Sequence, residues 1–244
     1  MATILEGTEK NIQILLSNKE LHDQLLVIER AGRTCYQSIK GPITYETAEK
    51  FCKMLLKRGH LSVLEHSHVP VKLVNPSRGV THELVRHRVA MAFSQESTHF
   101  VDESDVTFII PPNINPDQEV PLDETGNHAM TARELVELIE AFYRGLISEK
   151  IQPRYARQFL PIGLKAEIIA STNFRQWRHI FMMRTQKAAH WEIRSCMGNL
   201  LRQLQNAVPV VFDDFEEIGV DNLGVPYYTC EYGSVGMLVN KESK

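Results

Sequence analysis

The chain of 244 residues is long enough for one large domain, or two small ones, with a sizeable hydrophobic core. Its composition is ordinary for a soluble globular protein, with 43% hydrophobic and 23% charged residues. The formal net charge of −3 argues against a general nucleic-acid binder, because such proteins usually carry an excess of Lys and Arg. Any positively charged site must therefore be local.

The sequence shows no signal for a membrane or for secretion. It contains no run of about 18 apolar residues, so we expect no transmembrane helix. The N-terminus has no basic region before an apolar stretch, so we expect no secretory signal. Cys35, Cys52, Cys196 and Cys230 form no CxxC pair. Free, mostly buried thiols in a reducing cytoplasm fit this pattern best.

The first elements alternate between strand and helix patterns. Residues 11–17 predict a strand, and the apolar periodicity of residues 20–36 predicts a helix. A second helix is expected at residues 43–59, where Thr44 is a capping residue and Gly59 a stop signal.

A valine-rich strand and a charged helix are expected next. Residues 66–74 alternate as a strand does, and Pro70 places this strand at a sheet edge or at a bulge. Residues 77–91 predict a helix, followed by a turn and by a strand at residues 106–112.

The second half of the chain contains the clearest loop and the longest helical pattern. Residues 111–126 are rich in Pro, Asn and Asp and predict a surface loop, with a lid over a site as the alternative. We expect a helix at 131–147, a strand at 165–172 and one long helix at 174–207. The tail from Val208 mixes strand-like and turn-like segments. Since no βαβ unit repeats, an α/β (mixed α+β) domain is favoured.

The segment HELVRHR at residues 82–88 concentrates charge in one predicted helix. A zinc site of the HExxH type needs two histidines four residues apart, but Arg86 stands where the second would be. His87 falls on the apolar stripe of this helix, whereas Arg86 and Arg88 point elsewhere. The arginines either complement the helix dipole at a solvated helix end or serve a local anionic site.

Arg184 lies in an otherwise apolar seam of the long predicted helix, between Trp177 and Trp191. An unpaired buried cation is costly, so Arg184 needs a partner. That partner is either a structural carboxylate or an anionic ligand held by two hydrogen bonds. Arg157 and Arg175 also lack a matching cluster of carboxylates, which suggests a small anion such as a phosphate.

Other chemistries have weaker support. The chain contains no GxGxxG, no GxxxxGK[ST] and no GxSxG segment. His66 and His68 would share one face of a strand near His60, so a metal site is conceivable, but no further ligand completes it by spacing. We therefore expect no metal.

Five ordered blocks resemble the flavin-dependent thymidylate synthases: GHLSVLEH, VRHRVAMAFSQESTHFV, ARQFLP, STNFRQWRHIF and MRTQKAAHWEIR. The family signature is Arg-His-Arg followed, about seven or eight residues later, by a serine. Here eight residues separate Arg88 from Ser97. The resemblance spans roughly residues 20–215. It predicts a catalytic domain at residues 1–215 and a C-terminal extension of unknown role at 216–244.

The resemblance implies the reductive methylation of dUMP to dTMP. FAD would be the redox cofactor, NADPH the reductant and methylenetetrahydrofolate the one-carbon donor. It also implies a single domain with a central mixed sheet and long helices, in a cytoplasmic homotetramer whose active sites lie between subunits. The expected partners are small-molecule nucleotide and folate substrates, with no nucleic acid and no membrane.

The resemblance also gives expected roles to individual residues. The residues expected to contact FAD are Ser62, Arg86, His87, Arg88, Gln95, Asn173, Arg175 and His179. Those expected to hold the nucleotide are Glu83, Arg86, Gln95, Ser97, His99, Arg157 and Arg184. Arg184 is the expected catalytic residue, because a desolvated guanidinium would stabilise negative charge on the pyrimidine. Ser97 is expected to be a hydrogen-bond donor, since no base within its motif would activate it.

Four positions depart from the usual family pattern. His99 and Phe100 replace an Arg-Tyr pair, His190 stands where glutamine is often found, and Glu83 occupies a position where some members have glutamine. These differences keep alternatives open. One is C5-methylation of UMP or of a modified pyrimidine nucleotide, and another is a non-catalytic nucleotide-binding paralogue. A metal-dependent hydrolase is a more distant alternative.

Overall fold

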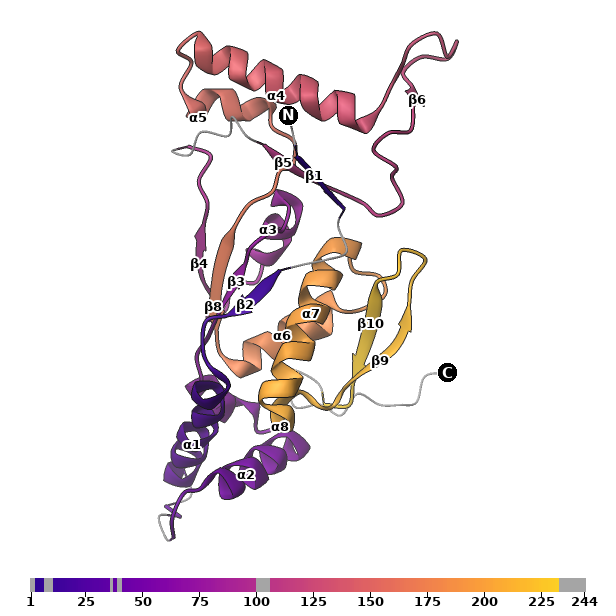
Figure 1. Ribbon diagram of the computed structural model, residues 1–244. Helices are drawn as coiled ribbons and strands as arrows, with labels where there is room; N and C mark the ends of the chain where they lie inside the picture. Colours follow the sequence, from indigo (N-terminus) through magenta and orange to yellow (C-terminus); the bar gives the residue numbers. More distant parts are fainter. Residues whose placement is uncertain (1–2, 7–10, 36, 39–40, 100–105, 233–244) are drawn as a thin grey trace.

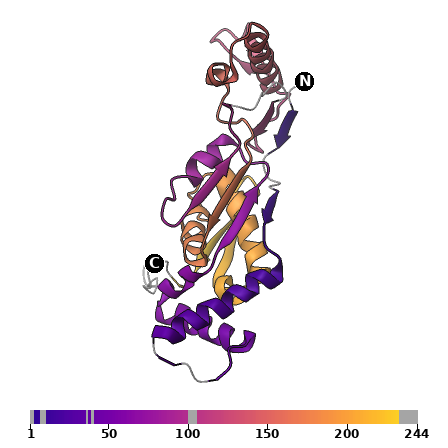
Figure 2. The same cartoon turned by 90° about the vertical axis from the view of Figure 1, so that its left-hand side faces the viewer.

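The computed structural model describes residues 3–6, 11–35, 37–38, 41–99 and 106–232. Figures 1 and 2 show an elongated molecule with a sheet at its centre. Helices α4 (Ala132–Ser148) and α5 (Pro153–Ala156) lie at one end, and α1 (Asn18–Cys35) and α2 (Tyr45–Arg58) at the other. Phe100 lies outside the described residues.

The central sheet has four strands in the order β2-β3-β8-β4. Their bounds are Ile12–Ile14 for β2, Val69–Leu73 for β3, Ile168–Thr172 for β8 and Ala92–Gln95 for β4. All three pairings in this sheet are antiparallel. Parallel pairing occurs in a separate two-stranded sheet of β1 (Thr3–Glu6) and β5 (Thr107–Ile110). The expected mixed α/β class is confirmed, although the central sheet itself is antiparallel.

The prediction that Pro70 marks a sheet edge is wrong, because β3 is an interior strand paired with both β2 and β8. The carbonyl of Pro70 accepts a hydrogen bond from Leu15 N at 2.9 Å, so this residue faces the β2 side. Strand β2 pairs only with residues 71–73 of β3. The missing N–H of Pro70 therefore falls just beyond the paired part of β2, where its loss disturbs no ladder.

Several expected helices and strands are confirmed. Thr44 caps α2, its side chain accepting from Thr47 N, and Gly59 ends the helix at φ 69°, a conformation that favours glycine. Strands β5 and β8 and helices α1 and α4 also agree with the predicted ranges, to within three residues at their ends. Helix α4 begins at a capping box formed by Thr131 and Glu134.

Residues 111–126 are mostly turns, as expected, with many exposed side chains. They include the short strand β6 (Val120–Pro121), which pairs with β7 (Ala129–Met130). This segment lies next to α4 in Figure 1. The 3-10 turns η1 (Leu61–His66) and η2 (Arg157–Phe159) connect other elements.

The predicted helix at 77–91 is too long, because α3 covers only Arg78–Leu84. After Leu84, the amide of His87 bonds to the carbonyl of Leu84 at 3.1 Å, which tightens the chain into a turn. Ala90 then adopts φ 53°, and β4 begins two residues later to pair with β8. Tertiary strand pairing thus overrides local helical periodicity, and the arginines of the RHR segment leave the helix.

The predicted long helix at 174–207 is two helices, α6 (Phe174–Arg184) and α7 (Trp191–Ala207). The break lies directly after Arg184. Two carbonyls in the break, those of Lys187 and Ala189, accept hydrogen bonds from the side chain of Arg194 on α7 at 2.7 and 2.8 Å. These bonds run from a side chain to the backbone, so helical spacing alone does not reveal the break.

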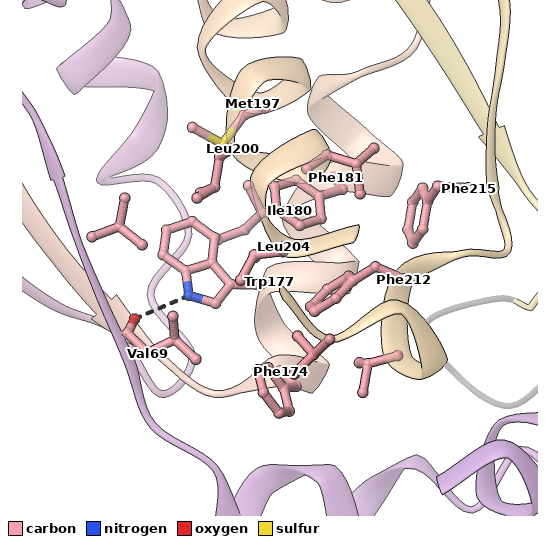
Figure 3. Packing of buried hydrophobic residues seen from close by; sticks show 14 of the residues in the cluster. Val69, Phe174, Trp177, Ile180, Phe181, Met197, Leu200, Leu204, Phe212 and Phe215 are labelled. Atoms are coloured by element: carbon pink, nitrogen blue, oxygen red, sulfur yellow. Dashed lines mark hydrogen bonds between the residues drawn. The ribbon is translucent and has the colours of Figure 1, made fainter. Parts of the chain in front are cut away.

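The main core lies between the sheet and the α6–α7 pair (Figure 3). Trp177 is fully buried among apolar side chains of α6 and α7, including Phe181 and Leu200. Its indole N–H donates to the carbonyl of Val69 on β3 at 3.1 Å. This bond satisfies the buried indole and ties α6 to the sheet.

The chain after α7 packs back onto the same core. Helix α8 (Pro209–Phe212) leads into the hairpin of β9 (Phe215–Val220) and β10 (Pro226–Cys230). Phe212, Phe215 and Tyr228 are buried in the core cluster. The mixed strand and turn character expected for the tail is confirmed over its described part.

All four cysteines are free thiols. Within the described residues, no helix is both long and apolar enough to cross a bilayer. The same residues contain no group of three His, Cys, Asp or Glu side chains arranged to hold a metal ion.

Candidate active site

Arg184, the last residue of α6, is the centre of the candidate site. Its Nη1 donates to Glu83 Oε2 at 2.8 Å, its Nη2 to the carbonyl of Glu83 at 3.3 Å, and its Nε to His87 Nε2 at 3.0 Å. The side chain is 20% exposed. The question left open by the sequence is therefore answered by a carboxylate partner within the chain.

The pairing leaves part of the guanidinium available. An arginine has five N–H donors, and three of those of Arg184 are used by Glu83 and His87. The other two have no acceptor among the described residues. The arrangement is thus a fixed cation that can still donate hydrogen bonds to a bound molecule.

His87 is buried, although it lies in the turn after α3 and not on a helix face. Burial, followed by the nearby charges of Arg184 and then His179, lowers the pKa of His87 to about 4. The imidazole is therefore neutral at physiological pH. Because Nε2 accepts from Arg184, the ring proton is assigned to Nδ1. A neutral His87 can thus orient Arg184 without repelling it.

His179 lies beside His87, with ring centroids 6.1 Å apart and planes at 80°. Burial, followed by the charge of Arg175, lowers the pKa of His179 as well. The lowered pKa values favour the neutral form of both imidazoles in this pair.

A pocket of about 310 Å³ lies next to His179. Asn173 and Arg175 line it together with His179, and Glu65 and Ala90 complete part of its wall. Asn173 is the N-cap of α6, its side chain accepting from Gln176 N at 2.9 Å. The structure thus brings together three of the residues expected at the cofactor, in one pocket at a helix N-terminus.

Arg175 pairs with Glu65 of η1, the turn that also carries Ser62. Ser62 is exposed. Glu65 was not among the expected site residues, although it lies inside the matched block GHLSVLEH. The signal was therefore present in the sequence, but spacing alone did not connect residue 65 with residue 175.

Arg86 and Arg88 are exposed in the turn between α3 and β4. The amide of Arg86 bonds to the carbonyl of Glu83 at 3.4 Å, but neither arginine side chain makes a hydrogen bond or an ion pair with another described residue. Helix α3 ends at Leu84, so both arginines follow its C-terminus instead of lying within the predicted helix. They are better described as two unneutralised cations next to the pocket wall formed by Val89 and Ala90.

A second group of expected residues lies at the other end of α3. Arg157 donates from Nη1 to Thr98 Oγ1 at 3.4 Å, and the amide of His99 donates to Ser97 Oγ at 3.3 Å. Arg78, at the start of α3, contacts the carbonyl of Glu96 at 3.3 Å. Gln95 ends β4, just before this group.

The expected nucleotide-binding residues therefore form two separate groups in one chain. Glu83 and Arg184 meet near the end of α3, whereas Ser97, His99 and Arg157 gather near its start. His190 belongs with the first group, since its Nδ1 lies 3.6 Å from Glu83 Oε1.

A pH dependence follows from the environment of His87. The folded protein binds this proton less tightly than the unfolded chain, since the pKa is about 4 instead of 6.5. Stability from this group is therefore present above 6.5 and is lost as the pH falls toward 4. His87→Gln keeps an acceptor for Arg184 but does not titrate. Urea unfolding at about pH 7 and about pH 4.5 should show a smaller loss of unfolding free energy in the variant. Equal losses in both proteins would contradict this assignment.

Comparison with known proteins places this geometry in a family. Residues 16–210 match the family described as "Thymidylate synthase complementing protein". Flavin-dependent thymidylate synthases of Mycobacteroides abscessus and Mycobacterium avium are each 36% identical, over 198 and 199 residues. Each match covers 78% of this chain and 79% of the relative.

Two solved structures share the fold. They are crystal structures of PolB, a UMP/dUMP methylase from Streptomyces cacaoi, bound with 5-Br dUMP or 5-Br UMP. Each has a TM-score of 0.64 at 17% identity and covers 86% of this chain and 95% of its own. At this identity, the likeness concerns the fold alone. The family match and the 36% identical relatives span most of the chain, so it belongs to the flavin-dependent thymidylate synthases, a family of methyltransferase enzymes.

Proposed function

We propose that this protein catalyses the reductive methylation of dUMP at C5 to give dTMP. The observation that carries the proposal is Arg184, a largely buried guanidinium fixed by Glu83 and His87 with two donors left over. A cation held in this way stabilises negative charge that develops on a pyrimidine ring without having to reorganise. The family uses FAD as cofactor, with NADPH and methylenetetrahydrofolate as co-substrates.

The residues around the pocket fit an anionic dinucleotide. Arg86 and Arg88 have no carboxylate partner among the described residues, so their charge is available to a pyrophosphate. The pocket of about 310 Å³ is too small for a whole FAD and would hold one portion of it. When bound, FAD supplies the redox chemistry. The proposed contacts are Ser62, Arg86, His87, Arg88, Gln95, Asn173, Arg175 and His179.

The two groups of expected residues suit the two ends of a nucleotide, each group being supplied by a different subunit. Arg184 and Glu83 are proposed to hold the pyrimidine, and Arg157, Ser97 and His99 the phosphate. Arg86 and Gln95, between the groups in sequence, are proposed to complete the site. Ser97 Oγ accepts from the amide of His99, which leaves its own O–H free to donate to the nucleotide.

The cysteines give no support to a thiolate nucleophile. Burial raises the pKa of Cys52 to about 12 and that of Cys230 to about 11, so both thiols stay protonated at physiological pH. Cys196 is buried on α7 and Cys35 lies at the end of α1, on an element apart from Arg184. This agrees with a route through the flavin instead of a cysteine adduct.

The protein is further proposed to act as a cytoplasmic homotetramer with sites shared between subunits. Large apolar side chains are exposed on α4, η2 and the loop after it: Leu135, Leu138, Phe142, Phe159 and Ile162. Apolar patches of this kind mark protein interfaces. A partner subunit could bring its second group of nucleotide-binding residues to the Arg184 of this chain. A reducing cytoplasm suits free thiols.

Within this proposal, residues 1–215 form the catalytic domain and residues 216–244 a C-terminal extension. The family match, which ends at residue 210, supports a boundary near this point.

A second candidate function is C5-methylation of UMP. It is favoured by His99, which stands where the family usually has an arginine and which the structure places beside Ser97. A shorter, titratable side chain there changes the reach and the charge of a group proposed to contact the nucleotide, which leaves room for a substrate other than dUMP.

Tritium release from 5-labelled substrate tests the reaction. With FAD, NADPH and methylenetetrahydrofolate, we expect the protein to release tritium from labelled dUMP faster than from labelled UMP. Arg184→Ala should lower the rate by about 100-fold or more, because the electrostatic stabilisation is lost. Met183→Ala, at an exposed neighbouring position, is the matched control and should keep its rate. Release from UMP alone would favour the second candidate, and silence with both substrates would refute methylation.

FAD retention tests the proposed role of the arginines. Arg88→Ala should weaken FAD binding by about tenfold or more, since a charge-assisted hydrogen bond to the pyrophosphate is removed. Arg58→Ala removes another exposed arginine, at the end of α2, and should bind FAD as the wild type does. Flavin fluorescence during titration of FAD into the cofactor-free protein measures both affinities. Equal affinities in the two variants would remove Arg88 from the cofactor site.

A further inference from the structure

The loop between α6 and α7, residues 185–190, lies next to the pair formed by Arg184 and Glu83. Arg184 immediately precedes this loop and His190 ends it, and both side chains face Glu83. A shift of the loop would therefore change the position of Arg184 relative to its partners.

Arg194 on α7 fixes this loop from inside the protein. It is only 2% exposed, and its Nη1 donates to the carbonyls of Lys187 and Ala189 at 2.7 and 2.8 Å. Both carbonyls lie in the break between the helices. A single guanidinium thus holds the loop in place at two points.

Asp221 neutralises Arg194. The Nη2 of Arg194 donates to Asp221 Oδ2, and the same carboxylate accepts at Oδ1 from the amides of Leu223 and Val225, each at 2.9 Å. Asp221 lies in the turn between β9 and β10, so the turn itself sets the direction of the carboxylate. Without this partner, Arg194 would be a buried and uncompensated cation, which is strongly unfavourable.

The hairpin makes a second contact with the same loop. The amide of Tyr228 on β10 donates to the carbonyl of Thr185 at 2.9 Å. Thr185 follows Arg184 directly in the chain. The hairpin therefore holds the beginning of the loop through Thr185 and its middle through Arg194.

We propose that the C-terminal hairpin positions Arg184 for catalysis, with Asp221 and Arg194 as positioning residues that hold the 185–190 loop. This inference rests on the proposed function and gives a role to a segment beyond the family match, which ends at residue 210. The residues act through Arg184 and touch neither substrate nor cofactor. Because small misplacements of a catalytic group are costly, loosening the loop lowers kcat more than it raises KM.

Asp221→Asn is the sharpest test, because asparagine keeps the Oδ1 acceptor for Leu223 and Val225 but replaces Oδ2 with an NH2 group, so both the charge and the acceptor toward Arg194 are lost. Glu216→Gln removes one negative charge from an exposed position of β9 and is the matched control. Arg194→Lys is a second variant that keeps the charge but not the planar set of donors. Circular dichroism establishes that each variant is folded.

Two readouts separate positioning from activity. Hydrogen exchange, measured by mass spectrometry on the FAD-loaded protein, reports on the amides of Thr185 and Ala189, which bond to Phe181 O at 2.9 Å and Gln186 O at 3.0 Å. In Asp221→Asn both amides should exchange faster, and kcat for tritium release from dUMP should fall by about tenfold with KM and FAD content nearly unchanged. Glu216→Gln should change neither exchange nor kcat.

Other outcomes overturn the proposal in distinct ways. Unchanged exchange in both Asp221→Asn and Arg194→Lys would show that the hairpin does not hold the loop. Faster exchange with normal kcat would show that the loop does not position Arg184. If the wild type itself has no turnover, the methylation proposal fails and the catalytic role of the hairpin fails with it, while the exchange rates still decide whether Asp221 holds the loop.

Discussion

The pairing of Arg184 is the constraint on which the candidate site depends. A largely buried guanidinium requires compensation, and here Glu83 and a neutral His87 provide it from the end of α3 and the turn that follows. Helix α6 must therefore stop at Arg184, close to the end of α3. The lowered pKa of His87, caused first by burial, keeps this histidine an acceptor and not a competing cation.

The surrounding fold supplies the positions that this pairing needs. Trp177 anchors α6 to β3, which fixes the direction in which the helix approaches α3. At the start of α3, Ser77 is the N-cap, and its amide and hydroxyl both donate to the buried carboxylate of Glu192 on α7. Both partners of the Glu83–Arg184 pair are thus tied to the same core of α6, α7 and the central sheet.

Capping residues and apolar periodicity in the sequence correctly predicted the helices whose ends are set by neighbouring residues. Thr44 and Gly59 gave the ends of α2, and apolar periodicity gave α4. The wrong predictions occur where contacts with residues far away in the sequence determine the secondary structure. The break after Arg184 depends on Arg194 and on the hairpin, and β4 exists because β8 lies beside it. Strand β1 also escaped prediction, because it is four residues long and depends on its pairing with the distant strand β5.

For the candidate site, the expected residues could be named from the sequence, but not their partners or their arrangement in space. The family resemblance of the sequence blocks gave expected roles to individual residues, and the structure gathers three of these, Asn173, Arg175 and His179, in one pocket. Spacing could not choose between a carboxylate and a ligand as the partner of Arg184, because Glu83 is 101 residues away. It also could not show that the proposed phosphate-binding residues lie at the opposite end of α3 from Arg184.

That separation leads to the central claim, that one nucleotide is held by Arg184 of one subunit and Arg157 of another. Complementation between inactive variants tests it most directly. Arg184→Ala and Arg157→Ala would each be purified alone and then as co-expressed mixed oligomers, and tritium release from 5-labelled dUMP would be measured for each. The account predicts that the mixed oligomers regain activity, because some sites combine an intact Arg184 from one subunit with an intact Arg157 from its neighbour. Mixed oligomers that stay as inactive as the separate variants would contradict the account and place both arginines in a site built by a single chain.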